Sequence, residues 1–141
     1  MAKKKTNRAA GDAFQVRIAE IFVEAGYMVH MAKPSKKRYY QGGRAVFRTV
    51  QEDIFGIWDM IALRGDKPPI FIQTTTSGVS ARKKKMAAKG ALLPTEIDSL
   101  LVAEDRRKSA EPGALRFWIQ DGRDGDYFEE VDWQTLEVFA K

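Results

Sequence analysis

Two runs of sequence decide the fold: residues 53–63, DIFGIWDMIAL, and residues 70–76, IFIQTTT. Both are rich in β-branched and aromatic residues, which favour strands. Residues 64–69 between them contain one glycine and two prolines, which is typical of a turn that interrupts a strand ladder. The pattern predicts a β-hairpin with strands over about residues 57–64 and 69–76.

The polar side chains of this hairpin form a chemically coherent set. Because side chains alternate faces along a strand, Asp59 lies on one face of the first strand, and Gln73 and Thr75 share a face of the second. A carboxylate, an amide oxygen and a hydroxyl suit a Mg²⁺ ion that activates water against a phosphodiester. Asp53 adds a second carboxylate if the chain bends at Gly56, although an ordinary loop role for Asp53 is also open.

The rest of the chain alternates helical and extended patterns. Asp12 is expected to cap a helix that runs to about Ala25 and stops at Gly26, and Ser80 a second helix that ends at Gly90. Strands are expected near residues 27–31, 44–50, 100–104, 115–120 and 127–133, and a basic loop over 32–43. The order predicts an α/β domain over residues 12–141, with a central mixed sheet and helices against it, preceded by a disordered basic arm over residues 1–11.

Charge is distributed unevenly over the 141 residues, whose net charge is +5. Residues 1–48 hold eleven basic and three acidic side chains, and residues 82–89 hold five basic and no acidic ones. One positive surface facing a polyanion, with DNA as the expected partner, explains this asymmetry, and a solvated surface that aids solubility is the alternative. The predicted DNA-binding residues are Arg82, Lys83, Lys84 and Lys85 in the second helix, and Lys36, Lys37 and Arg38 in the basic loop.

Composition excludes several classes of site. The chain has no cysteine and a single histidine, His30, so a disulfide framework, a thiolate zinc site and a histidine metal cluster are excluded. No apolar run approaches the roughly 20 residues that span a bilayer, and the start of the chain lacks the apolar segment of a signal peptide. We therefore expect a cytoplasmic protein without a membrane partner.

Three segments of the chain, residues 11–29, 56–63 and 70–78, resemble the PD-(D/E)XK nuclease superfamily, and their layout is closest to that of the archaeal-type Holliday junction resolvases. The resemblance implies a restriction-endonuclease-like fold with a central mixed sheet flanked by helices. It also implies a site built from a glutamate on the first helix, an aspartate at the start of a strand, and Glu-x-Lys on the adjacent strand. A basic helix follows in that pattern.

The chain keeps part of this pattern and departs from it at three positions. Asp59, in WDMIAL, matches the aspartate motif, whereas Gln73 stands where the second acid stands and Thr75 where the lysine stands. Aligning the glycines that flank the first helix places Gln15 at the glutamate position. Glu20 and Glu24 are then expected to face solvent.

Two functions follow, and a third is retained. The first is a metal-dependent DNA endonuclease, with branched DNA as one candidate substrate and a homodimer as the expected assembly. In it, Asp59 and Gln73 hold Mg²⁺ or Mn²⁺, Asp53 and Gln15 assist, and Thr75 orients water or phosphate. The second is a catalytically inactive, nuclease-fold DNA-binding or accessory protein, because fewer carboxylates mean weaker Mg²⁺ binding. The third is a protein-interaction domain that uses the aromatic residues of the last strands, for which core packing is the expected role: Phe117, Trp118, Tyr127, Phe128 and Trp133.

Overall fold

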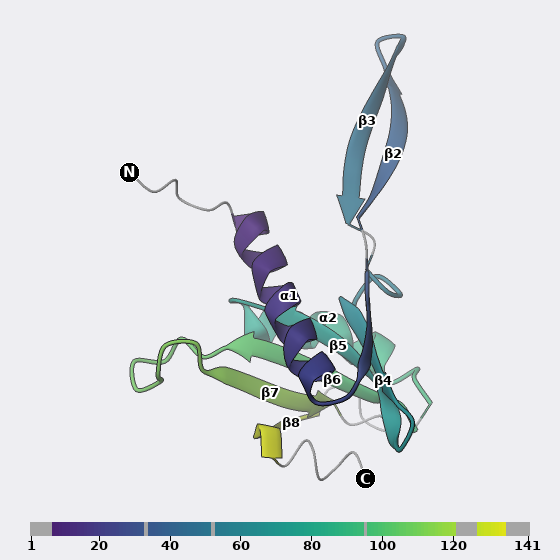
Figure 1. Ribbon diagram of the computed structural model, residues 1–141. Coiled ribbons are helices and arrows are strands. Elements are labelled where there is room, and N and C mark those ends of the chain that lie inside the picture. The colour runs from purple at the N-terminus through teal and green to yellow at the C-terminus, as the bar shows by residue number, and fades with distance from the viewer. Residues whose placement is uncertain (1–6, 33, 52, 95, 121–126, 135–141) are drawn as a thin grey trace.

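The structure, a computed structural model, describes residues 7–32, 34–51, 53–94, 96–120 and 127–134. Its centre is a six-stranded sheet in the order β1-β4-β5-β6-β7-β8, in which β5 and β6 are parallel and all other neighbours antiparallel (Figure 1). A separate two-stranded sheet is formed by β2 and β3. The elements are α1 (Asn7–Glu24), β1 (Met28–Met31), β2 (Pro34–Gln41), β3 (Arg44–Gln51), β4 (Met60–Arg64), β5 (Lys67–Thr75), α2 (Val79–Gly90), β6 (Asp98–Glu104), β7 (Leu115–Gln120) and β8 (Phe128–Val131).

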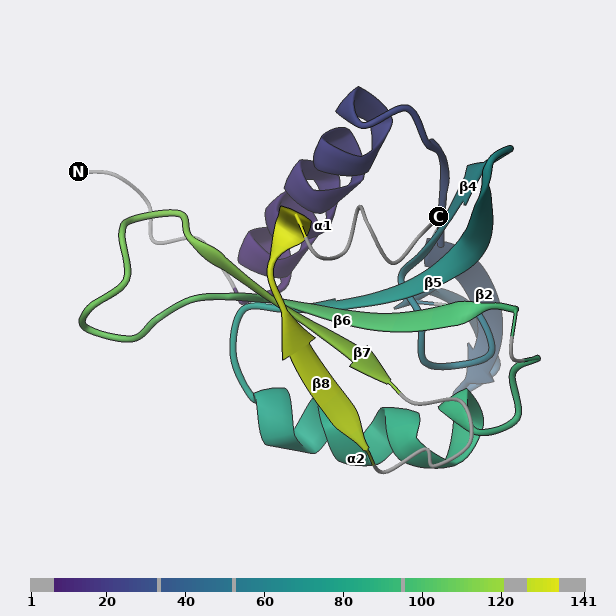
Figure 2. The same ribbon diagram turned by 90° about the horizontal axis from the view of Figure 1, so that it is seen from below.

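The two helices cover opposite faces of the six-stranded sheet (Figure 2). The face under α1 packs Ile18 and Phe22 against Met60 and Ile72. The other face packs Met86 of α2 in one cluster with Phe71, Leu101 and Trp118. Alternation along the strands therefore divides the apolar side chains between two cores, and the predicted α/β class with a central mixed sheet and flanking helices is confirmed.

The helix α1 begins at Asn7, earlier than the predicted start at Asp12. Ala9 and Ala10 favour helix strongly enough to extend it toward the N-terminus despite Gly11. Residues 7–11 of the predicted disordered arm are thus helical, and residues 1–6 lie outside the described residues. The end of the helix agrees with prediction, because α1 ends at Glu24 and Gly26, two residues later, adopts a left-handed φ of 96°.

The predicted basic loop over residues 32–43 is wrong. Residues 34–41 form β2, which pairs antiparallel with β3 along its full length, from Pro34 opposite Gln51 to Gln41 opposite Arg44. The connection is a two-residue turn of Gly42 and Gly43, with left-handed φ angles of 59° and 75°. A Gly-Gly pair is a recognised hairpin signal, and it was the sequence feature that could have predicted β2.

The two prolines predicted to interrupt the ladder of the central hairpin lie within β5, at a break in its pairing with β4. Pro68 and Pro69 belong to β5, but β5 pairs with β6 only from Ile70 onward. They also lie where the β4–β5 register shifts, between the pairs Arg64–Lys67 and Ala62–Ile70, so the predicted interruption of the ladder is confirmed.

The helix α2 begins at Val79 and is preceded by Gly78 in a left-handed conformation, so Ser80 is not its cap. Gly90 is its last residue and is buried against Gln120 of β7. The Gln120 side chain accepts a hydrogen bond from Ser99 Oγ (2.7 Å) and donates one to the carbonyl of Met86 (2.9 Å). Ser99 in turn accepts from the indole of Trp58. A buried polar chain thereby fixes α2 to the sheet.

Gly90→Ala is expected to destabilise the fold. A Cβ at this position would stand 1.9 Å from Gln120 Oε1, so Gln120 would have to leave its hydrogen bonds with Ser99 and Met86. Overpacking of this kind costs about 1–3 kcal/mol, which urea denaturation would measure. Gly65→Ala is the matched control, because its Cβ would meet no atom within 4 Å. Equal stability of the two variants would contradict the close packing of Gly90.

Neither helix of the described residues is long and apolar enough to cross a membrane.

Candidate functional site

A cavity of about 400 Å³ lies at the end of the sheet where β5 finishes, near the first turns of α1 and α2. It is lined by all of the predicted catalytic and metal-binding residues: Gln15, Asp53, Asp59, Gln73 and Thr75. The structure thus brings together residues that span sixty positions of the sequence. Among the predicted DNA-binding residues, Arg82 also lines this cavity.

Asp59 stands directly before β4 and is held by β5. Its backbone N–H donates to the carbonyl of Ile72 (2.8 Å), and its carboxylate Oδ2 accepts from both the backbone N–H (2.7 Å) and the hydroxyl (2.8 Å) of Thr74. The side chain is buried, with 4% of its surface exposed. Two donors from one residue therefore fix the orientation of the carboxylate in the cavity wall.

Burial raises the pKa of Asp59 from 3.8 to about 6, because desolvation disfavours the charged form. The hydrogen bonds from Thr74 oppose this rise, as does the positive charge of Arg82, and the neighbouring carboxylate of Asp53 adds to it. Two acidic side chains thus interact within one cavity. A buried carboxylate with a raised pKa beside a second acid is a common feature of functional sites.

Asp53 enters the cavity from a tight turn. The carbonyl of Ile54 accepts from the N–H of Ile57 (3.1 Å), and the two residues between them, Phe55 and Gly56, have left-handed φ angles of 53° and 75°. Phenylalanine rarely adopts this conformation, which costs of order 1–3 kcal/mol and is often found at functional sites. Asp53 Oδ1 is buried and has no hydrogen-bond partner among the described residues.

Gln73 leaves a second oxygen without a partner. Its amide nitrogen donates to the carbonyl of Thr74 (3.1 Å), whereas its Oε1 is buried and makes no hydrogen bond within the described part of the chain. Buried polar atoms are usually paired, and an exception requires an explanation such as an ion. Two carboxylates and an amide oxygen around one cavity are the ligand types that Mg²⁺ prefers, so Asp53, Asp59 and Gln73 fit a divalent cation.

No group of three His, Cys, Asp or Glu side chains suited to a metal ion occurs in the described residues. The third protein ligand would therefore come from the neutral amide of Gln73. This set carries fewer negative charges than a three-carboxylate site, and weaker cation binding follows from it.

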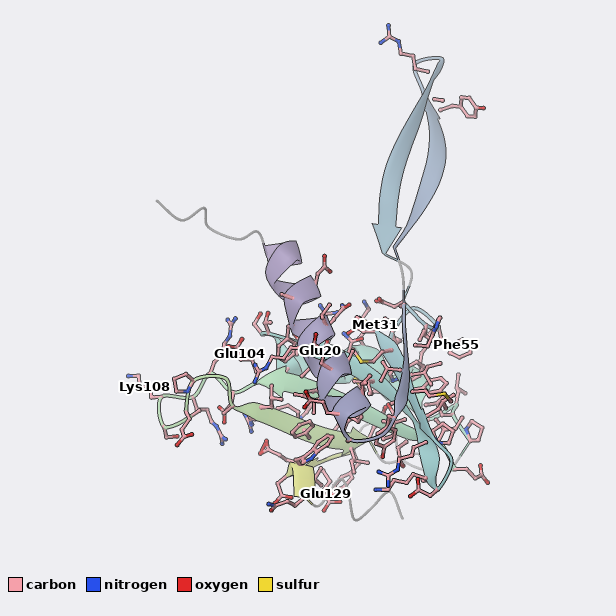
Figure 3. The ribbon with its side chains drawn as sticks, viewed as in Figure 1. Glu20, Met31, Phe55, Glu104, Lys108 and Glu129 are labelled. Atoms are coloured by element: carbon pink, nitrogen blue, oxygen red, sulfur yellow. The ribbon has the colours of Figure 1, made fainter. Side chains whose placement is uncertain are left out.

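Thr75 lines the cavity, but its hydroxyl is engaged locally. It donates to the carbonyl of Ser77 and accepts from the N–H of Ser77 (3.2 Å). Because its only hydrogen is used, Thr75 can act on a ligand only as an acceptor. Gln15 is half-buried on α1, whereas Glu20 and Glu24 are exposed and do not line the cavity (Figure 3 labels Glu20). Glu20 and Glu24 are thus exposed, as expected, and Gln15 is the α1 residue of the predicted set that lines the cavity.

The four predicted cations of α2 have different surroundings. Arg82 lines the cavity, while the ammonium of Lys83 lies over the rings of Trp118 (4.8 Å) and Phe128 (5.6 Å). Lys84 and Lys85 are exposed. Only Arg82 of this set therefore stands at the cavity, and the others contribute charge to the surface beside it. Lys36, Lys37 and Arg38 belong to β2 of the separate hairpin.

Among the cavity residues that the sequence interpretation did not include, Thr74 and Arg106 bear most on the chemistry. Along β5, Thr74 points to the face opposite that of Gln73 and Thr75. Asp59 lies just before β4, and its carboxylate accepts hydrogen bonds from Thr74 there. Arg106 follows β6 and comes to the cavity through the parallel pairing of β5 with β6. Neither residue has a local signal in the sequence. Thr74 could have been considered as a donor, because it lies on the strand expected to pair beside Asp59.

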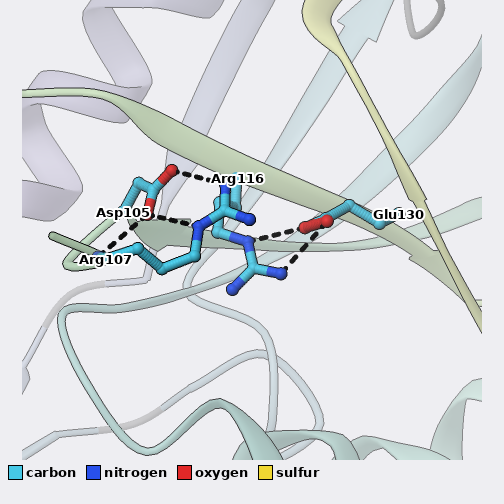
Figure 4. A network of polar contacts seen from close by, with 4 residues as sticks. All are labelled: Asp105, Arg107, Arg116 and Glu130. Carbon is cyan, nitrogen blue, oxygen red and sulfur yellow. Dashed lines mark hydrogen bonds and ion pairs between the residues drawn. The ribbon is translucent and has the colours of Figure 1, made fainter. Parts of the chain in front are cut away.

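Basic and acidic side chains are paired on the surface beyond β6. Arg107 donates to Asp105 and Arg116 donates to Glu130, as Figure 4 shows. The Arg107 guanidinium lowers the pKa of Asp105 to about 2, and Arg116 lowers the pKa of Glu130. Arg107 and Arg116 are therefore neutralised by neighbouring acids.

The aromatic residues of the last strands take core positions rather than forming an exposed face. Phe117 and Trp118 are buried, and Trp133 packs edge-on against Phe22 of α1 at 5.3 Å between ring centroids. Tyr127 alone of the five is an exposed large hydrophobic residue. This favours the expected core role over a protein-interaction surface.

No protein-family model matches the chain, and neither a curated protein nor a solved structure is significantly similar to it.

Proposed function

We propose that the protein is a metal-dependent DNA endonuclease with a restriction-endonuclease-like fold of the PD-(D/E)XK type. The observation that supports this most is the pair of buried, unpartnered oxygens, Asp53 Oδ1 and Gln73 Oε1, which share a cavity with the Asp59 carboxylate. The side-chain oxygens suit a cation, and the two arginines that line the same cavity, Arg82 and Arg106, suit a phosphate. The mixed sheet, with a helix on each face, agrees with the proposed fold.

The chain's residues divide the chemistry between them. Asp59, Gln73 and Asp53 would hold Mg²⁺ or Mn²⁺, which neutralises phosphate charge and lowers the pKa of water when bound. Thr74 keeps the Asp59 carboxylate aimed at the cavity through its two hydrogen bonds. Arg82 and Arg106 line the same wall and would bind the non-bridging phosphate oxygens. Hydrolysis then adds water to phosphorus and breaks the bond to one ester oxygen, which takes up a proton.

Arg82 is assigned the electrostatic role of the family lysine that Thr75 replaces. Thr75 has no charge and its hydroxyl is committed to Ser77, whereas Arg82 is near enough to lower the pKa of Asp59 through its charge. A guanidinium cannot lose its proton near neutral pH, so this role is phosphate binding and not proton transfer.

The resemblance also implies a homodimer, which light scattering would show as twice the mass of one chain.

The test of this function is cleavage of labelled four-way junction, duplex and single-stranded DNA with Mg²⁺, with Mn²⁺ and with EDTA. We expect cutting with either metal and none with EDTA, and the substrate cut fastest defines the DNA structure preferred. DNA binding without cutting in either metal would contradict the enzyme and support the inactive DNA-binding protein.

A further inference from the structure

The β2–β3 hairpin is the largest feature of the molecule that the site does not use. It forms its own two-stranded sheet and stands out from the body of the protein (Figure 1). Each strand has eight residues, so at about 3.4 Å per residue the ribbon is about 27 Å long. An isolated two-stranded hairpin is marginally stable in water, which indicates that a partner stabilises it.

The charge of this hairpin identifies the chemistry of the partner. Residues 34–51 contain no acidic residue and five basic ones, namely Lys36, Lys37, Arg38, Arg44 and Arg48. By sequence the segment carries a charge of +5, and the register pairs each basic position with a neutral or another basic one. A polyanion would neutralise this charge. A second copy of the same hairpin, carrying the same charge, would be repelled.

The shape of the hairpin fits a duplex groove. The strands are joined by only two glycines, and the tip residues Gly42, Gly43, Arg44 and Ala45 are exposed. Tyr40, near the tip, is 71% exposed. The major groove of B-DNA is about 12 Å wide and admits a two-stranded β-ribbon.

Both ends of the hairpin are anchored at the cavity. Ala32, just before β2, donates its N–H to the carbonyl of Asp59 (2.7 Å), and Asp53, just after β3, lines the cavity wall. A duplex held along the ribbon would therefore lead to the residues that we assign to the metal.

We infer that the β2–β3 hairpin is a DNA-binding arm that enters the major groove of duplex DNA beside the cleavage site. This inference rests on the proposed function for its choice of polyanion. The hairpin positions the substrate and contributes no group to the chemistry, so its loss affects binding and its salt dependence.

The experiment measures the affinity for a fluorescent duplex by anisotropy in EDTA, over a series of salt concentrations, for four proteins. These are the wild type, Arg44→Ala, Arg44→Lys and Lys108→Ala. Arg44 is at the start of β3, and Lys108 is an exposed cation in the β6–β7 connection, on a different part of the molecule (Figure 3). Arg44→Ala and Lys108→Ala remove the same charge, so any difference between them reports position.

We expect Arg44→Ala to reduce the slope of log K against log salt by about 0.9, the value for one lost phosphate contact. Arg44→Lys should restore the slope, and Lys108→Ala should leave it at the wild-type value. All four should melt at the same temperature, because Arg44 is an exposed tip residue. A wild-type slope in Arg44→Ala, or an equal decrease in Lys108→Ala, would overturn the inference.

Cleavage by the same proteins separates this inference from the proposed function. Metal-dependent cutting with an unchanged slope in Arg44→Ala would refute the arm and leave the nuclease intact. A decreased slope in a protein that cuts nothing would support the arm as a DNA-binding element and refute the enzyme. A wild type that binds no duplex would refute both.

Discussion

Asp59→Asn is expected to reduce metal-dependent DNA cleavage by at least about 10²–10³-fold, the range seen when a single electrostatic group of a catalytic site is removed. Among the described residues that line the cavity, this carboxylate alone is held by two hydrogen bonds from one residue, Thr74. Asparagine keeps the shape and one acceptor oxygen but loses the charge that would anchor the cation. Initial rates at saturating Mg²⁺ and at saturating Mn²⁺ would measure the loss.

Asp98→Asn is the matched control for this variant. Asp98 is also a carboxylate whose pKa burial raises, but it lies opposite Ile70 at the far end of the β5–β6 pair from the cavity. Its amide variant should cut DNA at the wild-type rate. A normal rate in Asp59→Asn, or an equal loss in both variants, would show that the cavity does not perform the chemistry.

The free energy of unfolding is expected to depend on pH through Asp59. Its pKa is about 6 in the folded protein and 3.8 when it is unperturbed, so the folded state binds more protons between these values. Stability therefore falls as pH rises from about 4 to about 6, and it remains lower above that range. A shift of this size corresponds to about 3 kcal/mol, at 1.36 kcal/mol per pKa unit.

Asp59→Asn should remove this penalty. We expect it to equal the wild type near pH 4 in the absence of metal and to exceed it by up to about 3 kcal/mol at pH 7.5. Urea denaturation in EDTA at both pH values would measure the difference, in which the contributions of Asp98, Asp105 and Glu130 cancel. A variant less stable than wild type at pH 7.5 would mean that the charged form of Asp59 is not disfavoured in the fold. If Asp59→Asn is more stable than the wild type but inactive, the charged Asp59 costs the protein stability that its function requires.

The central hairpin and the first site residues could be predicted because their signals are local. Strand-forming residues on either side of the Gly65 turn mark β4 and β5, and the register places Met60 opposite Ile72, which brings Asp59 beside the end of β5. Helical periodicity placed Gln15 toward the cavity in the same way. These features depend on sequence spacing within single elements.

The features that were missed depend on contacts between distant parts of the chain. β2 carries three consecutive basic residues, which favour a polar loop on composition, and only its pairing with β3 makes it a strand. Arg106 reaches the cavity through the parallel β5–β6 pairing, whose register no local pattern encodes. Gly90 ends α2 as predicted, but the close approach of Gln120 to it, which involves residues thirty positions apart, has no local signal.

The most direct test of the central claim is a calorimetric titration of the metal-free protein with Mn²⁺ at pH 7.5, beside Asp59→Asn and Asp98→Asn. We expect one cation bound per cavity in the wild type and in Asp98→Asn, with binding lost in Asp59→Asn and weakened below pH 6 as the carboxylate becomes protonated. Equal Mn²⁺ binding by all three proteins, or none by the wild type, would contradict the assignment of Asp53, Asp59 and Gln73 to a metal centre.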